Sequence, residues 1–460
     1  MSVYPRFHAA LLVIFLLLPR AIRAQDQFVD GTMPEDQLPG LKAILTNALR
    51  QSPEMIRNEI IVAEGEAGVY SSDHSLWPSV NGGAQYGTNR SSTTGGAAST
   101  QSGFFYNVGL NQPIFQWGAL INQSRIGRIK LLVNEKQYAD AYRQLAVSLR
   151  EQYFSLILKE VAIRNARFSN TITQGELDVL EQRRKSGAVS EAELILPRLN
   201  AEDSSLSLEQ NEESLENAKI AFAHLAGLKR INDSDIPLAI PKGAYDKSKT
   251  NVLLASLLGS QAHDTLQSQV YRLEIRQDDL DYKIAKVGLL PKLNLGAGYS
   301  VENETTAFNT TIEQTVINQL TYNLNVSWSI FDGFATKGAK LSALASKRLD
   351  ERLFKTYVDT TEQQAQHLAR MVDIAARYQD LADRRMDQQD GSLREATAEL
   401  KRGIAAQNVV DAAQQAWYAV DYGRTSAHSD YLSAWIEFVS LVGRDPALNN
   451  LPPRYVRETP

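Results

Sequence analysis

The residues of this sequence that could do chemistry stand beside two glycines, Gly187 and Gly403. Charged and amide side chains lie within eight residues of these glycines: Glu193 follows the first, and Arg402, Asn408 and Asp411 flank the second. Acidic side chains that face the axis of a symmetric oligomer would form a charged ring that favours cations. The alternative is that these residues are solvated helix charges or helix-capping contacts.

Other sequence patterns that carry chemistry are missing. The six histidines are scattered and form no His-x-x-x-His metal pair. The sequence has no Gly-x-Ser-x-Gly motif and no phosphate-binding loop. It has no cysteine, which excludes disulfides, thiol catalysis and a lipidated N-terminal cysteine. We therefore expect no enzymatic activity, no metal site and no cofactor.

The charge balance argues against nucleic-acid binding, and the N-terminal residues indicate secretion. The 48 basic and 53 acidic residues among 460 give no basic footprint for nucleic acid. Residues 1–24 predict a secretory signal peptide, with Arg6 as its charged end, an apolar stretch at 9–18 and the small residue Ala24 at the cleavage site. An uncleaved anchor is the alternative, although the apolar stretch is short for a membrane helix. No later segment has 18 consecutive apolar residues, so we expect no spanning helix.

The sequence contains an internal duplication. The segment Pro78–Tyr86 is echoed by Pro291–Tyr299, and Phe222 is echoed by Phe438 at nearly the same separation. This nearly constant offset indicates a repeated unit of about 200 residues. The predicted organisation is a first repeat, a connector, a second repeat and a C-terminal tail: residues 25–229, 230–250, 251–445 and 446–460.

Each repeat contains two stretches in which apolar and small polar residues alternate, and this period of two predicts β-strands. The predicted strands and the loops between them are 76–88, 104–115, 291–302 and 319–331 with loops at 89–103 and 302–317. About ten tilted residues cross a bilayer, whereas ordinary strands have about five or six. One face is apolar and the other is small and uncharged, as in a transmembrane strand. A half-buried sheet in a soluble protein is the alternative.

Aromatic side chains gather at the ends of the predicted strands: Trp77, Trp117, Trp328 and Phe331. Such side chains suit the headgroup level of a membrane, so we expect these four at the interface. Four strands are too few to close a barrel, and an open edge in lipid leaves backbone groups unpaired. If the strands span a membrane, other copies of the chain must complete the barrel.

Two unusually long stretches, 118–186 and 335–401, contain no proline and few other helix breakers. Their apolar residues advance in alternating steps of three and four, which is typical of coiled-coil packing. Each stretch would extend about 100 Å as an unbroken helix. Each ends at Gly187 or Gly403, where we expect a left-handed turn followed by a returning helix. Because these helical hairpins carry many charges, we expect them in water.

Together these features resemble the TolC-like outer-membrane efflux proteins of Gram-negative bacteria. The resemblance is carried by strand-start prolines, strand-end motifs, turn glycines and Leu-x-Gly helix ends: Pro78, Pro291, 112–118, 328–333, Gly187, Gly403, Gly227 and Gly443. Each motif is weak alone, but their order and duplication extend the resemblance over residues 40–445.

The resemblance implies a fold, an assembly and partners. The fold class is mainly α with a transmembrane β-barrel: three identical chains would each give four strands to one 12-stranded barrel in the outer membrane, and the helices would form a periplasmic α-barrel. The implied function is the passive exit duct of a tripartite efflux pump or type I secretion system. Its implied partners are a periplasmic adaptor protein, an inner-membrane pump or ABC exporter, and outer-membrane lipid.

The resemblance also assigns roles to the turn residues. The family keeps acidic residues just past the turn glycines, where they face the closed tip, and Glu193 stands where the family has an aspartate. The second turn matches less well, because Asp411 is displaced by one residue and Asn408 lies near the other expected acid. The arginine expected after Gly403 is absent, and Arg402 is the candidate substitute. Both glycine turns also resemble the family's adaptor-docking sites.

Two other hypotheses come from the same sequence. A soluble periplasmic coiled-coil adaptor or scaffold shares the signal peptide and the long helical hairpins, but not strands of membrane length with aromatic ends. A secreted enzyme lacks any site. The exported substrate is not encoded in a readable motif, because specificity in the resembled family belongs mostly to the pump. The missing lipidated cysteine slightly favours the non-lipidated members, which include protein-secretion ducts.

Overall fold

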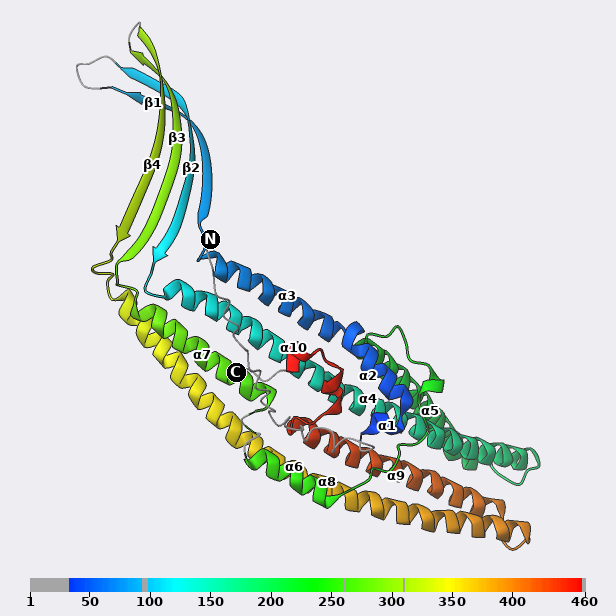
Figure 1. Ribbon diagram of the computed structural model, residues 1–460. Coiled ribbons are helices and arrows are strands. Elements are labelled where there is room, and N and C mark those ends of the chain that lie inside the picture. Colours follow the sequence, from blue (N-terminus) through cyan, green and yellow to red (C-terminus); the bar gives the residue numbers. More distant parts are fainter. Residues whose placement is uncertain (1–32, 93–97, 260–261, 263, 309–310, 457–460) are drawn as a thin grey trace, which may run out of the picture.

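Four long strands project from one end of an elongated layer of helices in the computed structural model (Figure 1). The structure describes residues 33–92, 98–259, 262, 264–308 and 311–456. The predicted signal peptide at 1–24 lies outside these residues.

The strands form one antiparallel sheet in the order β1-β2-β3-β4. Their bounds are Ser79–Ser91, Ser99–Phe115, Lys292–Phe308 and Thr311–Ser327, which is 13 residues for β1 and 17 for each of the others. The two repeats meet in the middle of the sheet, where Val108 of β2 lies opposite Tyr299 of β3. The outer edges of β1 and β4 have no partner within the described part of the chain.

The strands extend farther into the predicted loops than the sequence indicated. Most of the predicted loop at 302–317 is strand, since β3 continues to Phe308 and β4 begins at Thr311. The apolar–polar alternation ends at 302–306, where every residue is polar, but the backbone ladder continues regardless of side-chain polarity. At the other end, β4 stops at Ser327, so Trp328 and Phe331 follow the sheet rather than belonging to it.

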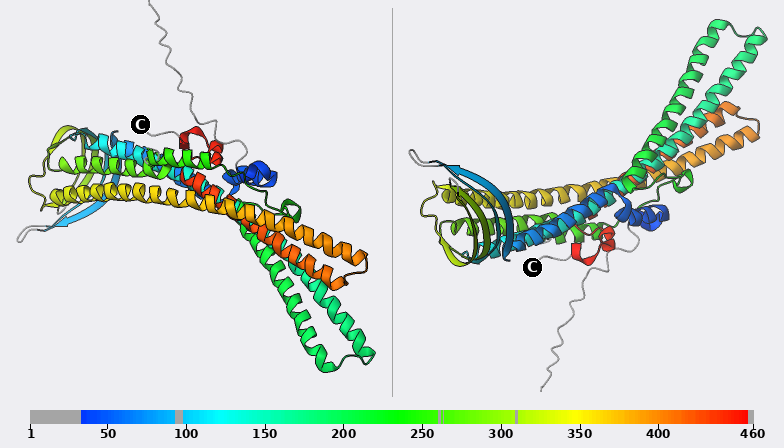
Figure 2. Two further views of the ribbon diagram at one scale, coloured as in Figure 1. Left: turned by 90° about the horizontal axis from the view of Figure 1, so that it is seen from below. Right: turned by 90° about the horizontal axis from the view of Figure 1, so that it is seen from above.

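Two helices of 67 residues dominate the rest of the molecule. These are α4 (Ala119–Lys185) and α8 (Ala335–Lys401), and each is followed by a returning helix, α5 (Glu191–Ala226) or α9 (Gln407–Leu441). At about 1.5 Å per residue, α4 and α8 each extend about 100 Å. Figure 2 shows that the α4–α5 and α8–α9 hairpins diverge toward their turns.

Shorter elements complete the layer: α1 (Pro34–Gln37), α2 (Pro39–Gln51), α3 (Pro53–His74), η1 (Asp233–Asp235), α6 (Lys247–Gly259), α7 (Leu266–Lys286), η3 (Pro446–Asn450) and α10 (Pro453–Val456). Beside the strands the helices neighbour one another in the order α3, α4, α7, α8, and farther away the order is α5, α4, α9, α8. The helix predicted from Leu41 to His74 is divided at Ser52, because Pro53 begins a new helix.

The main hydrophobic core lies about midway along the helices. Tyr142, Leu149, Phe222 and Ile436 are fully buried there. Arg150 is also fully buried, and it forms ion pairs with one carboxylate from each end of the described chain.

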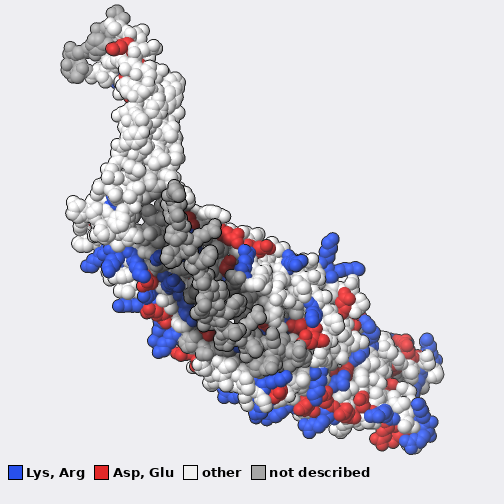
Figure 3. Space-filling model, in the orientation of Figure 1, with Lys and Arg blue, Asp and Glu red and all other residues white. Residues whose placement is uncertain are grey.

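The strands and the helices differ in how many charged side chains they carry. Figure 3 shows Lys, Arg, Asp and Glu side chains over the helices and almost none over the strands. None of the helices in the described ranges is both long and apolar enough to span a membrane. The strands expose large apolar side chains: Val80, Tyr86, Val108, Leu320, Tyr322, Leu324 and Val326.

Candidate gate and membrane-boundary sites

The first candidate gate lies at the turn between α4 and α5. α4 ends at Lys185, and Gly187 adopts a φ of +78°. The backbone N–H of Ala188 donates to the carbonyl of Arg183 at 2.9 Å, which closes the end of the helix. Glycine adopts this left-handed conformation without the penalty that a Cβ would add, so the chain reverses here.

Glu193 caps the helix that follows this turn. Its Oε2 accepts hydrogen bonds from the backbone N–H of Ser190 at 2.7 Å and from the Ser190 hydroxyl at 2.8 Å. The backbone N–H of Glu193 donates to Ser190 Oγ at 3.4 Å, which completes a capping box. The bonds from the Ser190 backbone and side chain lower the pKa of Glu193. Its carboxylate is therefore both a helix cap and an exposed negative charge.

A neighbouring carboxylate holds the first turn together. Glu191 accepts from Arg184 of α4 at 2.7 Å and from Arg198 of α5 at 2.7 Å. Sequence reasoning missed this cluster; the available signal was an acidic residue at the start of one helix facing basic residues at the end of another. All three side chains are about half exposed, so the pairs fix the geometry of the turn more than they stabilise the fold.

The second candidate gate is the turn between α8 and α9. Gly403 has a φ of +72°, and the N–H of Ile404 donates to the carbonyl of Glu399 at 2.9 Å. The candidate residues make only local contacts: Arg402 Nε donates to Ala398 O at 3.3 Å, Asp411 accepts from Gln407 Nε2 at 2.8 Å, and Asn408 is exposed. The two turns lie apart in the single chain (Figure 2), so Glu193 and Asp411 do not meet within it.

A buried carboxylate joins the two hairpins before they diverge. Asp421 of α9 is 4% exposed and pairs with Arg164 of α4 and, at 3.0 Å, with Arg424 of its own helix. The Arg164 guanidinium lies 5.8 Å and 5.4 Å from the ring centres of Trp417 and Tyr418. These contacts form an ion-pair and cation–π clasp between helices from different repeats. No sequence motif marked it.

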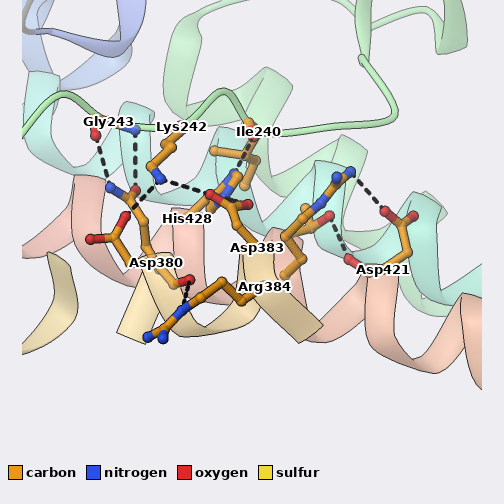
Figure 4. A network of polar contacts seen from close by, with 11 residues as sticks. Ile240, Lys242, Gly243, Asp380, Asp383, Arg384, Asp421 and His428 are labelled. Atoms are coloured by element: carbon orange, nitrogen blue, oxygen red, sulfur yellow. Dashed lines mark hydrogen bonds and ion pairs between the residues drawn. The ribbon is translucent and has the colours of Figure 1, made fainter. Parts of the chain in front are cut away.

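The connector between the repeats is bound to the second hairpin by a polar network (Figure 4). Lys242 Nζ donates to Asp380 at 2.6 Å and to Asp383 at 2.9 Å. The ring nitrogens of His428 lie 3.0 Å from Asp383 Oδ1 and 2.9 Å from the carbonyl oxygen of Ile240. Burial raises the pKa of Asp383, but the bonds from Lys242 and His428 outweigh it and lower the pKa. The connector is thus a strap across α8 and α9.

A group of carboxyls lies on one face of the helical layer near the strands. Glu274 and Asp278 of α7 and Asp350 of α8 line a cavity of about 700 Å³, together with Lys130 of α4 and residues of α3. Burial, followed by the hydrogen bond and charge of Asp350, raises the pKa of Asp278 to about 6. Burial likewise raises the pKa of Glu274. None of the described residues forms a group of His, Asp and Glu suited to a metal ion.

Two of the predicted boundary aromatics fasten the start of β3. Trp117 Nε1 donates to Pro291 O at 2.7 Å, and Trp328 Nε1 donates to Leu289 O at 3.0 Å. Trp117 follows β2 and Trp328 follows β4, so the connections on both sides of β3 bind the segment between α7 and β3. These two tryptophans stay 46% and 61% exposed, and Trp77 is 70% exposed.

The chain combines a sheet of long strands with a layer of very long helices, and comparison with known proteins gives its family. The family model described as "Outer membrane efflux protein" matches residues 44–228 and 261–444, which fall within the two predicted repeats. The chain belongs to this outer membrane efflux protein family. Proteins of the family are transport channels rather than enzymes.

Solved structures share the fold at low sequence identity. The Campylobacter jejuni CmeC outer membrane channel matches with a TM-score of 0.69 and 15% identity, over 92% of this chain and 90% of that one. The outer membrane protein VceC from Vibrio cholerae matches with a TM-score of 0.63 and 15% identity, over 88% and 97%. The open state of the Neisseria gonorrhoeae MtrE outer membrane channel gives 0.63 and 15%, over 88% and 89%. No curated protein sequence matches the chain.

Proposed function

We propose that three copies of this chain form one channel through the outer membrane and the periplasm. The channel is the passive exit duct of a tripartite efflux pump or a type I secretion system. Its 12 strands, four from each chain, close the barrel. The helices extend into the periplasm as a second, α-helical barrel, and the energy for export comes from the partner.

The observation that carries the proposal concerns the edges of the sheet and of the helical layer. On the same two sides of the chain, each ends in an element that has a neighbour on one side only. The sheet ends at β1 and β4. The helical layer ends at α3 and α8 beside the strands, and at α5 and α8 farther away. An unpaired strand edge in lipid leaves backbone groups unsatisfied, at several kcal/mol each. When the β4 edge of one copy pairs with the β1 edge of the next, a closed ring satisfies every edge.

The free helical edges expose the apolar side chains that such a ring would bury. On α5, the exposed residues Leu199, Leu206 and Ile220 follow one another at one and two heptads. On α8, Met371, Ile374 and Tyr378 follow in steps of three and four and are also exposed. These two stripes favour α5 of one copy packing against α8 of the next.

The two glycine turns face away from the strands, at the periplasmic end of the proposed duct. There Gly187 and Gly403 would lie where an adaptor protein docks, and an inner-membrane pump or ABC exporter would act through that adaptor. The charges at Glu193 and Asp411, with Asn408 and Arg402 beside them, would be repeated threefold around the aperture. Such rings bias permeation toward cations.

The proposal is tested by extracting the full chain and measuring its assembly. We expect a heat-modifiable trimer in the detergent-extracted outer-membrane fraction, with three chains per particle by native mass spectrometry. The variant Leu206→Glu places a charge in the apolar stripe of α5 and should release monomers. The control Ser205→Glu adds the same charge at the adjacent exposed position, outside the stripe, and should leave the trimer intact. Recovery of the chain in the soluble periplasm would contradict the proposal.

A further inference from the structure

Four lysines gather where the helices of the second repeat meet the strands. Lys286 ends α7, Lys292 begins β3, and Lys337 and Lys340 lie in the first two turns of α8. Figure 3 shows basic side chains on the helix ends next to the strands, which carry few charges. Lys286 and Lys337 are exposed, and Lys292 and Lys340 are half-buried.

Contacts between the elements place these lysines at one end of the molecule. A Cβ at Gly288 would lie 3.0 Å from Thr336 Oγ1, so the end of α7 touches the start of α8. Lys292 lies opposite Ser327, the last residue of β4. The bond from Trp328 to Leu289 ties the same two connections together.

The positive charge of this group is not balanced within the chain. None of the four lysines forms a salt bridge with any residue that the structure describes. Two acidic side chains, one just before α8 and one on α7, have other partners. Asp332 accepts from the N–H and hydroxyl of Thr336 at 2.8 Å and 2.5 Å, and Asp279 pairs with Lys283 at 2.7 Å and Lys347 at 3.0 Å.

The first repeat provides an internal comparison, because its corresponding positions carry no lysine. When Pro78 is aligned with Pro291 and Phe115 with Phe331, the four lysines correspond to Asp73, Ser79, Ile121 and Ser124. Helix stability does not explain Lys337, since the positive end of a helix dipole repels a cation in the first turn. The charge at Lys337 therefore points to an anionic ligand outside the chain.

Two aromatic side chains lie beside the lysines on the strand side. Phe331 and Phe334 are 71% and 67% exposed and pack edge to face at 5.5 Å. Phe334 has a φ of +69°, and the corresponding turn of the first repeat is also left-handed at Trp117 and Gly118, so this conformation belongs to the strand-to-helix turn. Lys337 Nζ lies 6.0 Å from the Phe334 ring centre. Aromatic rings with lysines just beyond them match the order of acyl chain and headgroup at a membrane surface.

We propose that three of these lysines and the two rings, the lysine–phenylalanine patch of Lys286, Lys337, Lys340, Phe331 and Phe334, bind the headgroups of anionic phospholipids. Lys292 is not part of the patch, because it lies on the polar face of β3 with Asn294, opposite to the apolar face that carries Leu293. The phosphates lie against the ammonium groups, and the rings contact the upper acyl chains. The inference rests on the proposed function, in which the strands span the outer membrane and this end faces the periplasmic leaflet. In the trimer the patch occurs three times, once for each second repeat.

The test uses the full-length trimer with phosphatidylglycerol as the anionic probe and phosphatidylcholine as the neutral one. The test variant is Lys286→Gln, Lys337→Gln and Lys340→Gln combined. The control replaces three exposed lysines far from the strands: Lys229→Gln, Lys247→Gln and Lys355→Gln. Lipid retention is measured by native mass spectrometry at low and high salt. Since a lysine near an anionic surface contributes about a fivefold change in affinity, we expect the test variant to bind phosphatidylglycerol at least about twentyfold more weakly.

The neutral lipid separates charge recognition from general lipid contact. We expect phosphatidylcholine retention to be equal in the wild type, the test variant and the control, and the preference of the wild type for phosphatidylglycerol to fall with salt. Equal phosphatidylglycerol retention in the wild type and the test variant would overturn the inference, as would an equal loss in the control. If either happens while the protein stays trimeric and conducts ions, the lipid site fails and the proposed duct stands.

Discussion

At the scale of single residues, the carboxylate of Glu193 caps a helix and also supplies a negative charge to the proposed aperture. Glu193 stabilises the start of α5 through Ser190, and its pKa is lowered by those bonds, so it stays ionised at neutral pH. Among the described residues, Asp411 has only Gln407 as a side-chain partner, and it lies in the second turn of α9, a helix that lacks a side-chain N-cap. The two candidate gates therefore differ. The carboxylate of Glu193 is held in place by the capping box, whereas that of Asp411 can change its rotamer.

Removing both gate charges should reduce cation selectivity. Glu193→Gln keeps the capping box, because Gln also serves at this position, and Asp411→Asn keeps the side-chain shape. In planar bilayers under a salt gradient, we expect the ratio of cation to anion permeability to fall at least about twofold. The control combines Glu59→Gln with Asp359→Asn, two exposed carboxylates far from the turns. An unchanged reversal potential in the gate variant would refute the role of these residues.

The pair of Asp278 and Asp350 should make stability depend on pH. The pKa of Asp278 in the folded chain is about 6, above its ordinary value of 3.8, so the folded chain binds this proton more tightly than the unfolded chain. The resulting loss of stability begins above about pH 4, grows up to about pH 6 and is complete above that. The neighbouring charges are Glu274 and Asp281 on the same helix and Lys130 of α4.

Asp278→Asn should therefore raise the melting temperature at neutral pH. After allowance for solvent screening, we expect a gain of about 1 kcal/mol, or about 1–3 °C, near pH 7.5 and almost none near pH 4. The measurement is thermal unfolding of the detergent-solubilised protein at both pH values. Asp359→Asn on the exposed surface of α8 is the matched control and should be neutral at both. A gain of the same size near pH 4 would exclude this explanation.

At the scale of elements, each of the two long helices ends at a residue that leaves the helical backbone conformation. The helices α4 and α8 end where Gly187 and Gly403 adopt left-handed conformations, and no atom within 4 Å would obstruct a Cβ at either glycine. The constraint on these positions is therefore backbone conformation alone. Both glycines could be identified from the sequence because a helix of this length without proline has few other places to stop.

The contact between the two hairpins should depend on Asp421. Its replacement by Asn leaves Arg164 without its carboxylate partner, at a cost of about 2 kcal/mol. We expect amide hydrogen exchange to become faster around Arg164 and around Trp417 and Tyr418, since the clasp joins these segments. Arg167→Gln is the control because its exposed pair with Glu212 lies within one hairpin. Equal exchange in the wild type and Asp421→Asn would show that apolar packing alone holds the hairpins together.

At the scale of the whole molecule, both ends of the described chain are bound to the middle of α4. Arg150 of α4 pairs with Glu35 at 2.5 Å near the start of the described chain and with Asp445 at 2.6 Å near its end. The guanidinium is fully buried, and its fork geometry suits two carboxylates at once. This arrangement fixes the α1 and η3 segments against the helical layer, although the three residues lie far apart in the sequence.

The sequence by itself determined the duplication, the alternating strands, the long helices and the two glycine turns. These features depend on periodicity and on local backbone conformation, which neighbouring residues encode. Only the tertiary structure revealed the clasp at Asp421, the strap at Lys242, the Asp278 pair and the lysine–phenylalanine patch. Each joins residues from distant segments, and charged residues on helices look alike in sequence whether they face a partner or water. The free edges at β1, β4, α3, α5 and α8 also could not be found from the sequence, because whether a strand or helix lies at an edge depends on which elements are its neighbours in space.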